Sequence, residues 1–177
     1  MIIRSCEFND IPMITAIYAE AVINGTATFE LEPPSELEMT KRREALLANN
    51  YPYLVADKDG IVVGYAYAGE YHKRPAFHGT VEDSIYIHQN FQGKGMGTEL
   101  LKQLIVEATQ RDFRQMIAVV GDSANHGSIA LHKRQGFELI GTLHSVGWKH
   151  GRWLDTVIMQ RPLGDADNYP YKKLNKL

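Results

Sequence analysis

The spacing of apolar residues predicts two amphipathic helices. The first stripe has the i, i+3, i+4, i+7, i+8 spacing that places its members on one face of a helix. It consists of Ile14, Ile17, Tyr18, Ala21 and Val22. A second stripe of the same helical kind consists of Leu100, Leu101, Leu104, Ile105 and Ala108. Each stripe indicates a helix that buries one face against a core.

Runs rich in β-branched and aromatic residues predict a series of strands. The expected strands are 1–8, 53–56, 61–71, 81–87, 116–120, 138–148 and 153–160. Ser35 and Glu38 have the spacing of a capping box, so a further helix is expected to begin there. Asn125 as a cap and Gly136 as a terminator delimit a last, short helix.

The order of these elements predicts the fold class. Early helices, an antiparallel meander, one helical crossover and a final hairpin indicate an α+β domain on a mixed, mostly antiparallel sheet with helices on its faces. The length of 177 residues fits one domain. We expect that domain at residues 1–163, and a loosely held C-terminal extension at residues 164–177.

Composition excludes several classes of protein. With 44% hydrophobic residues and 10% aromatic residues the chain can form a real core, which argues against disorder. A net charge of −2 lacks the basic excess of a nucleic-acid binder. Cys6 is the single cysteine, and the histidines show no metal-ligand spacing, so neither disulfides nor a metal site are expected. No apolar stretch is long enough to span a membrane, and we expect a cytoplasmic protein.

A glycine-rich segment follows the strand at 81–87. Gly93, Gly95 and Gly97 stand where a helix begins, so backbone N–H groups can converge on an anion with the positive helix end behind them. The spacing matches neither the dinucleotide fingerprint nor the P-loop. The segment is therefore a candidate phosphate cradle, and the alternative is a glycine-rich helix start that binds nothing.

The pattern Gln92-x-x-Gly95-x-Gly97 resembles the acyl-CoA pyrophosphate loop of the GNAT superfamily of N-acetyltransferases. A second signature of this superfamily is similar to a later set of residues in the chain, namely Asn125, Ser128, Leu131 and Gly136-Phe137. Three further blocks are similar to the phosphinothricin and methionine sulfoximine acetyltransferase branch, namely 80–87, 117–122 and 146–155. The resemblance extends over residues 1–163. It implies a GNAT-like sheet with a splayed strand pair and helices on both faces.

This resemblance implies transfer of an acetyl group from acetyl-CoA to the α-amino group of a small amino-acid-like acceptor, by direct attack in a ternary complex. Methionine sulfoximine, methionine sulfone and phosphinothricin are the acceptors it suggests. The acetyl-CoA site that it implies comprises Ile85, Tyr86, Ile87, Gln92, Gly93, Lys94, Gly95, Met96, Gly97, Thr98, Asn125 and Ser128. We also expect a homodimer, in which the hairpin that carries Trp148 and Trp153 could complete the partner's pocket.

Two residues are candidates for catalysis. The resemblance places Glu82 at the mouth of the splayed strands, where a carboxylate can take the proton of the attacking amine; the alternative is a solvated charge at a strand end. Asp83 should face the other side of the strand and is the weaker candidate. His132 stands where most members of the superfamily have a tyrosine. It could protonate the leaving thiolate, or it could only contact the sulfur or pack.

The acceptor site is expected to include Thr28, Phe29, Tyr71 and Arg74 together with Glu82. Arg74 could hold a substrate carboxylate in a bidentate pair, or it could be an ordinary surface arginine. Two other functions stay open. One is acetylation of peptide or protein N-termini, and the other is a non-catalytic acyl-CoA-binding module, suggested by His132 in place of tyrosine.

Overall fold

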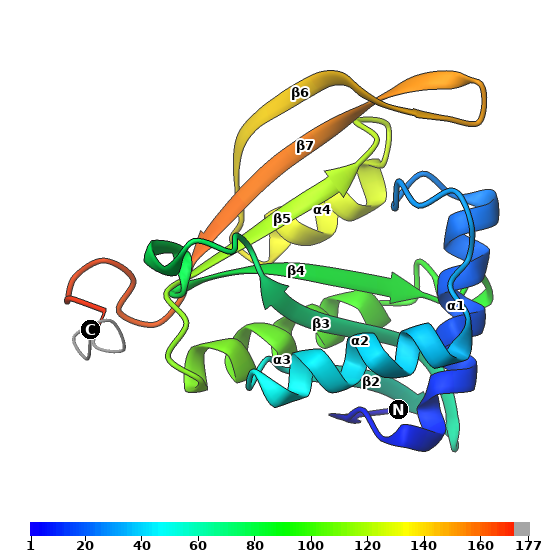
Figure 1. The fold of residues 1–177 in the computed structure, drawn as a ribbon, viewed down its shortest axis with the longest axis horizontal. Coiled ribbons are helices and arrows are strands. Elements are labelled where there is room, and N and C mark those ends of the chain that lie inside the picture. Colours follow the sequence, from blue (N-terminus) through cyan, green and yellow to red (C-terminus); the bar gives the residue numbers. More distant parts are fainter. Residues whose placement is uncertain (172–177) are drawn as a thin grey trace.

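Seven strands form one mixed sheet in the order β1-β2-β3-β4-β5-β7-β6 within residues 1–171, which are the residues that this computed structural model describes (Figure 1). The strands are β1 (Ile2–Ser5), β2 (Tyr53–Lys58), β3 (Ile61–Glu70), β4 (Thr80–Ile87), β5 (Gln115–Gly121), β6 (Glu138–Lys149) and β7 (Arg152–Pro162). Only β4 and β5 pair in parallel, and the other neighbours are antiparallel. The predicted α+β class is confirmed. The first strand is shorter than expected because a 3-10 turn at Phe8–Asp10 follows it.

Four α-helices connect the strands. They are α1 (Ile11–Asn24), α2 (Glu36–Ala48), α3 (Met96–Gln110) and α4 (His126–Arg134). The Ser35 side chain accepts a hydrogen bond from the backbone N–H of Glu38, so the predicted cap starts α2. Asn125 caps α4 in the same way, and Gly136, with φ of +80°, follows its end. Short 3-10 turns lie at Pro75–Phe77 and Gln89–Phe91.

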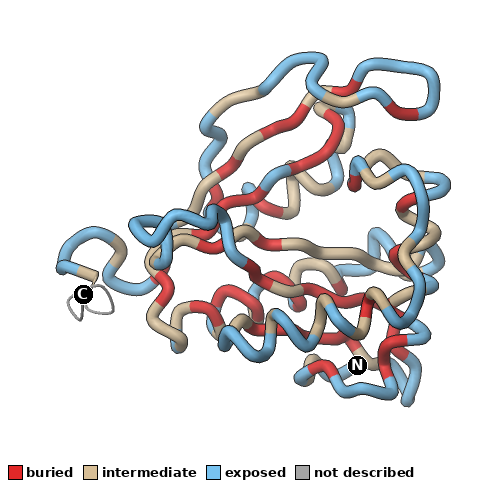
Figure 2. Tube along the Cα trace, viewed as in Figure 1, coloured by how far each residue is buried: buried red, intermediate tan, exposed pale blue. Residues whose placement is uncertain are grey.

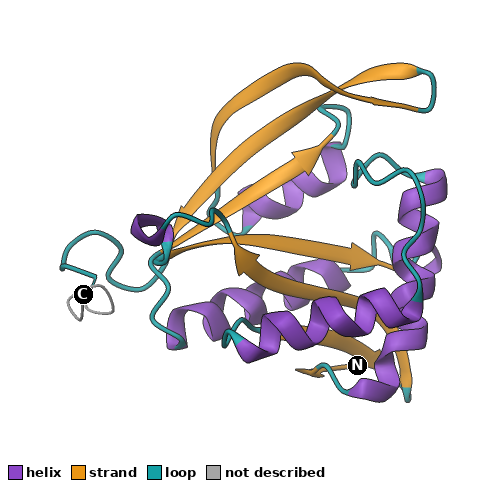
Figure 3. Cartoon of the chain, in the orientation of Figure 1, coloured by secondary structure: helices purple, strands orange, loops and turns teal. Residues whose placement is uncertain are grey.

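The sheet separates two hydrophobic clusters. Leu54 and Ala56 of β2 belong to the cluster beneath α3, whereas the alternate residues Tyr53 and Val55 belong to the cluster beneath α1 and α2. Helices therefore cover both faces of this half of the sheet, while the β6–β7 ribbon extends away from them (Figure 3). Buried residues concentrate on the strands and the inner helix faces, and most of β6 is exposed (Figure 2).

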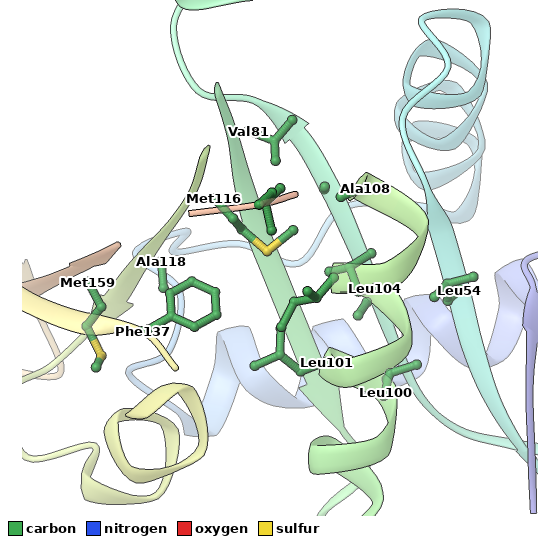
Figure 4. Packing of buried hydrophobic residues seen from close by; sticks show 14 of the residues in the cluster. Leu54, Val81, Leu100, Leu101, Leu104, Ala108, Met116, Ala118, Phe137 and Met159 are labelled. Atoms are coloured by element: carbon green, nitrogen blue, oxygen red, sulfur yellow. The ribbon is translucent and has the colours of Figure 1, made fainter. Parts of the chain in front are cut away.

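The apolar stripe of α3 forms the centre of the larger cluster. Leu100, Leu101, Leu104 and Ala108 are fully buried. Figure 4 shows these side chains gathered with Val81 and Met116 between the helix and the strands. This packing holds the N-terminus of α3 against the end of β4, and so positions the glycine-rich segment that connects them.

Strands β4 and β5 diverge along their length. They pair from Thr80 with Gln115 as far as Asp83 with Ala118, but β4 continues to Ile87 and β5 to Gly121. The ribbon view shows the gap between the two strands widening beyond this point (Figure 1). Residues 84–87 of β4 thus have no ladder partner on β5. The expected splayed strand pair is confirmed.

Part of the expected extension packs on the domain. Leu163, directly before the extension, is buried, and its backbone N–H donates a hydrogen bond to the carbonyl oxygen of Arg114. The Arg114 guanidinium lies 3.5 Å from Asp165, and the Tyr171 hydroxyl donates to the carbonyl of His78. These two contacts attach residues 164–171 to the domain, although most of these residues are exposed, so the loose attachment of the extension stays a prediction. The rest of the extension, 172–177, lies outside the described residues.

Candidate active site

A cavity of about 330 Å³ lies where β4 and β5 separate. Its walls come from the ends of these two strands, from the start of α4 and from the segment that follows α1. Glu82, Asp83 and His132 line it, as do Thr28 and Phe29. The divergence of two strands has therefore brought residues from several separate parts of the chain to one concave surface.

Glu82 is a half-buried carboxyl group in this cavity. Burial, and secondarily the charge of Asp83, raise its pKa to about 7. Near neutral pH the side chain is thus divided between the acid and the carboxylate. A carboxyl group with this pKa can accept a proton and release it again at the same pH.

Asp83 lies on the same face of β4 as Val81 and Ile85, opposite Glu82, as the alternation of side chains predicts, but it also lines the cavity because the strands separate here. Its Oδ2 lies 3.0 Å from Nε2 of His132, and both side chains are buried. The His132 Nδ1 lies 2.8 Å from the carbonyl oxygen of Ser128, one turn earlier in α4. Burial lowers the pKa of His132, but the Asp83 carboxylate and the two hydrogen bonds outweigh it, so the net shift is upward.

The glycine-rich segment has the backbone that an anion cradle requires. Gly93 and Gly95 have φ of +71° and +81°, and an added Cβ at either would meet nothing within 4 Å. These glycines are therefore needed for their backbone conformation, not for space. Gly95 caps α3, whose first N–H groups point outward as a site for negative charge. The Gln92 side chain donates to the carbonyl of Ile87 and ties the loop to the end of β4.

The remaining predicted cofactor residues lie around this cradle and the cavity. Ile85 and Tyr86 line the cavity at the unpaired end of β4, and Asn125 and Ser128 line it at the start of α4. Asn125 Oδ1 accepts from the backbone N–H of Ser128, so this oxygen serves as a helix cap. Lys94, Met96, Gly97 and Thr98 continue the cradle into the first turn of α3.

Apart from Glu82, two of the predicted acceptor residues line the cavity and two do not. Thr28 is buried in its wall and Phe29 stands at its rim. Tyr71 and Arg74 are exposed on the segment between β3 and β4 and do not line the cavity. The Tyr71 ring instead lies against Phe77, 5.8 Å between centroids.

Three tyrosines line the cavity, and sequence reasoning missed two of them, Tyr18 and Tyr67, having placed only Tyr86 in the site. Tyr18 and Tyr86 meet edge to face at 5.0 Å between ring centroids. The Tyr18 hydroxyl shares a hydrogen bond of 2.9 Å with Thr28 Oγ1. Tyr18 belongs to the apolar stripe of α1, and a stripe predicts burial without indicating which members end at a cavity.

The β6–β7 hairpin fastens the segment at residues 25–29 over the cavity. Lys149 is buried, and its Nζ donates to the Thr28 carbonyl oxygen at 2.8 Å. The His150 Nε2 donates to the carbonyl oxygen of Gly25 at 3.1 Å. The ring of Phe29 lies so close to Gly147 that a Cβ there would approach within 2.3 Å. Burial lowers the pKa of Lys149, although the charge of Glu30 opposes the shift.

Two kinds of feature are absent from the described part of the chain. Residues 1–171 hold no group of three or more potential metal ligands. No helix among them has the length and apolarity that crossing a membrane requires.

Comparisons with known proteins agree on one family. The model of the acetyltransferase (GNAT) family matches residues 16–137. A phosphinothricin N-acetyltransferase of Alcaligenes faecalis is 49% identical over 93% of this chain and 84% of its own length. The L-methionine sulfoximine/L-methionine sulfone acetyltransferase of Pseudomonas paraeruginosa is 40% identical, and the match covers 95% of this chain and 98% of that protein.

A solved structure is similar throughout. The GNAT superfamily phosphinothricin acetyltransferase from Sinorhizobium meliloti, crystallised with AcCoA, superimposes with a TM-score of 0.94. The two proteins are 48% identical, and the match covers 97% of this chain and 93% of the other.

Proposed function

Because this chain belongs to the acetyltransferase (GNAT) family, an acetyl-CoA-dependent group of N-acetyltransferases, we propose that it acetylates the α-amino group of a small amino-acid-like acceptor. The acceptor is of the methionine sulfoximine, methionine sulfone or phosphinothricin type. The cavity between β4 and β5 supports this most directly, because it joins a half-buried carboxyl group to a concave, partly aromatic pocket. A pocket of about 330 Å³ suits a single amino acid better than a protein terminus.

Acetyl-CoA fits the residues on the other side of the cavity. The backbone N–H groups at Gly93–Gly97 and the start of α3 would hold its pyrophosphate. The unpaired edge of β4 at residues 84–87 would accept the pantetheine arm as an additional strand, bound by main-chain hydrogen bonds. When bound, acetyl-CoA supplies an acetyl thioester at the split between the strands. The N–H near Ile87 would then stabilise negative charge on the thioester oxygen.

Glu82 acts as the general base in this proposal. The amino group of an acceptor is mostly protonated near neutral pH and must lose a proton to become a nucleophile. Glu82 lies in the cavity wall, and its pKa of about 7 suits proton transfer at that pH. The first proton passes from the ammonium group to the Glu82 carboxylate, directly or through a water, and then to solvent. The nitrogen loses its second proton to solvent as the amide bond forms and the C–S bond breaks, and the departing CoA thiolate takes a proton from solvent.

His132 stabilises the leaving thiolate in this proposal. Its buried ring lines the cavity, and although burial lowers its pKa, the charge of Asp83 and the hydrogen bonds to the ring outweigh this effect and favour the charged form. Both ring nitrogens already have protein partners. We therefore assign His132 an electrostatic role toward the sulfur while its protons stay in place.

The acceptor lies beneath residues 25–29. Thr28 and Phe29 form this cover, which Tyr18 holds from one side and Lys149 from the other. Tyr71 and Arg74 are left without a role in this site, because neither reaches the cavity.

The Lys149→Met variant tests that cover. Methionine retains the buried volume of the side chain but cannot donate to the Thr28 carbonyl. A hydrogen bond from a charged donor contributes roughly 1.5–3 kcal/mol, so the KM for the acceptor should rise about tenfold or more. The KM for acetyl-CoA should stay within twofold, since the cradle lies on the far side of the cavity. Equal changes in both KM values would show that the lysine supports the fold as a whole.

The substrate assignment is tested by CoA-thiol release across a panel of acceptors. The panel contains methionine sulfoximine, methionine sulfone, phosphinothricin, common amino acids, simple amines and short peptides. Turnover of methionine sulfoximine, methionine sulfone or phosphinothricin supports the assignment. Turnover of peptides alone would replace it by N-terminal acetylation, and no turnover despite acetyl-CoA binding would contradict it.

A homodimer is also part of the proposal, with the outer face of the β6–β7 ribbon as its interface. Large apolar side chains on this ribbon are more than half exposed: Leu139, Ile140, Leu143, Val146, Trp148 and Trp153. Exposed apolar patches mark interaction sites, and β6 is also an edge strand of the sheet. A second copy of the chain would cover both the apolar side chains and the open edge of β6. The cytoplasmic location stays a prediction from the sequence.

We expect light scattering to give about twice the mass of the 20.0 kDa chain. The Leu143→Glu variant places a charge on this face and should give monomers, whereas Val106→Glu on the exposed face of α3 should remain dimeric. A monomeric wild-type protein would contradict the proposed dimer.

A further inference from the structure

His132 has a hydrogen-bond acceptor at each ring nitrogen. Nδ1 lies 2.8 Å from the backbone carbonyl oxygen of Ser128, and Nε2 lies 3.0 Å from Oδ2 of Asp83. A carbonyl oxygen can only accept, so Nδ1 must carry a proton. A bare Nε2 would direct its lone pair at a carboxylate oxygen, which is repulsive. A second proton therefore lies between Nε2 and Oδ2.

The surroundings decide which partner holds this second proton. The side chain of Asp83 is 1% exposed, and its Oδ1 has no hydrogen-bond partner among the described residues. A buried carboxylate is stable only beside a compensating charge. The imidazolium ring supplies that charge, and the Phe137 ring, 5.0 Å away and nearly perpendicular, encloses it.

We propose that Asp83 is a positioning residue, which keeps His132 doubly protonated and fixes its ring in the wall of the cavity. Its role in transfer rests on the proposed function, because it acts through His132. The carboxylate orients the imidazolium by one hydrogen bond, and the Ser128 carbonyl fixes the opposite nitrogen. The ring thus has one orientation and one protonation state before any substrate arrives.

Asp83 acts on Glu82 as well. The two carboxyl groups are adjacent in β4, and the charge of Asp83 adds to burial in raising the pKa of Glu82. The polar and titratable groups that face this pair come from two other elements: Tyr67 on β3, and Ser128 and His132 on α4. One buried carboxylate thus keeps His132 charged and makes Glu82 a better proton acceptor.

The direct test is the protonation state of His132 by long-range ¹H–¹⁵N NMR near pH 7, without substrates. The signals are assigned by their loss in His132→Gln. In the wild type we expect both ring nitrogens to be protonated. In Asp83→Asn we expect only Nδ1 to be protonated, since burial favours the neutral ring once the carboxylate is gone. Asp155→Asn is the control, because Asp155 contacts the exposed His144 and should leave His132 unchanged.

A singly protonated His132 in the wild type would overturn the proposal, as would an unchanged ring in Asp83→Asn. If Asp83→Asn fails to fold, the wild-type spectrum still decides. The test involves no turnover, so it is independent of whether the proposed acceptors are acetylated.

The consequence for catalysis is measured separately. For an acceptor that the enzyme acetylates, the Asp83→Asn variant should have a kcat lower by roughly 10–100-fold, because it loses the partner that orients a functional histidine. The acidic limb of the kcat/KM profile should move to lower pH, because the like charge beside Glu82 is removed. A residue that only supports the fold would leave the position of this limb unchanged, and that result would also contradict the proposal.

Discussion

Replacing Glu82 by glutamine should lower kcat by about 10²-fold, the lower end of what a positioned general base contributes. Glutamine has nearly the same shape and still fits the cavity wall, but it cannot take a proton from the acceptor amine. The KM for acetyl-CoA should stay within about twofold, because the cradle at Gly93–Gly97 is separate from this side chain. The measurement is steady-state CoA-thiol release with the best acceptor of the panel.

The pH dependence of kcat/KM provides a second test of Glu82. Burial and the charge of Asp83 raise the pKa of Glu82 to about 7, and only the deprotonated form accepts a proton. The kcat/KM of the wild type should therefore rise as pH increases through about 7 and level off above it. The kcat/KM of the Glu82→Gln variant should not show this rise with pH.

The control for Glu82→Gln is Glu44→Gln, which makes the same change at an exposed position of α2 and should leave both kinetics and pH profile unchanged. A Glu82→Gln enzyme that kept kcat within twofold, with the acidic limb in place, would exclude Glu82 as the base.

Replacing Leu104 by alanine should lower the free energy of unfolding by about 2–5 kcal/mol. Leu104 is fully buried between α3 and the strands, in the middle of the larger hydrophobic cluster. Truncation removes apolar surface that was shielded from water and leaves a cavity that the close-packed neighbours can fill only in part. Urea unfolding followed by circular dichroism, at one fixed protein concentration, measures the loss.

Val106→Ala is the matched control, because Val106 is in the same helix but is 40% exposed. Its effect should stay within about 0.5 kcal/mol, as is usual for surface substitutions. Equal losses in the two variants would contradict the assignment of this stabilisation to burial of Leu104.

Much of the fold could be predicted from the sequence, because its signals are local. The stripes of α1 and α3 follow from the helical period, and the caps at Ser35 and Asn125 follow from residue types at fixed spacing. The glycine-rich cradle was found for the same reason, since Gly93 and Gly95 mark positive φ angles next to the start of a helix.

The predicted acetyl-CoA residues lie close together in the structure, whereas the predicted acceptor residues are divided. Most of the proposed donor site is one continuous segment and the edge of one strand, so order along the chain brings its residues together. The acceptor pocket comes from loops, and proximity along the chain did not indicate which loops reach it. Thr28 and Phe29 line the cavity, whereas Tyr71 and Arg74 lie outside it.

What the sequence by itself determined is therefore the set of elements, the sheet class, the donor loop and the candidate base at Glu82. Only the tertiary structure decided that Asp83 meets His132, 49 residues away, and that Lys149 holds the carbonyl of Thr28, 121 residues away. The alternation of side chains along an ordinary strand predicts that Asp83 turns away from Glu82. The separation of β4 from β5 opens the sheet at that point, so both carboxyl groups border one cavity, and this depends on the packing of the whole domain.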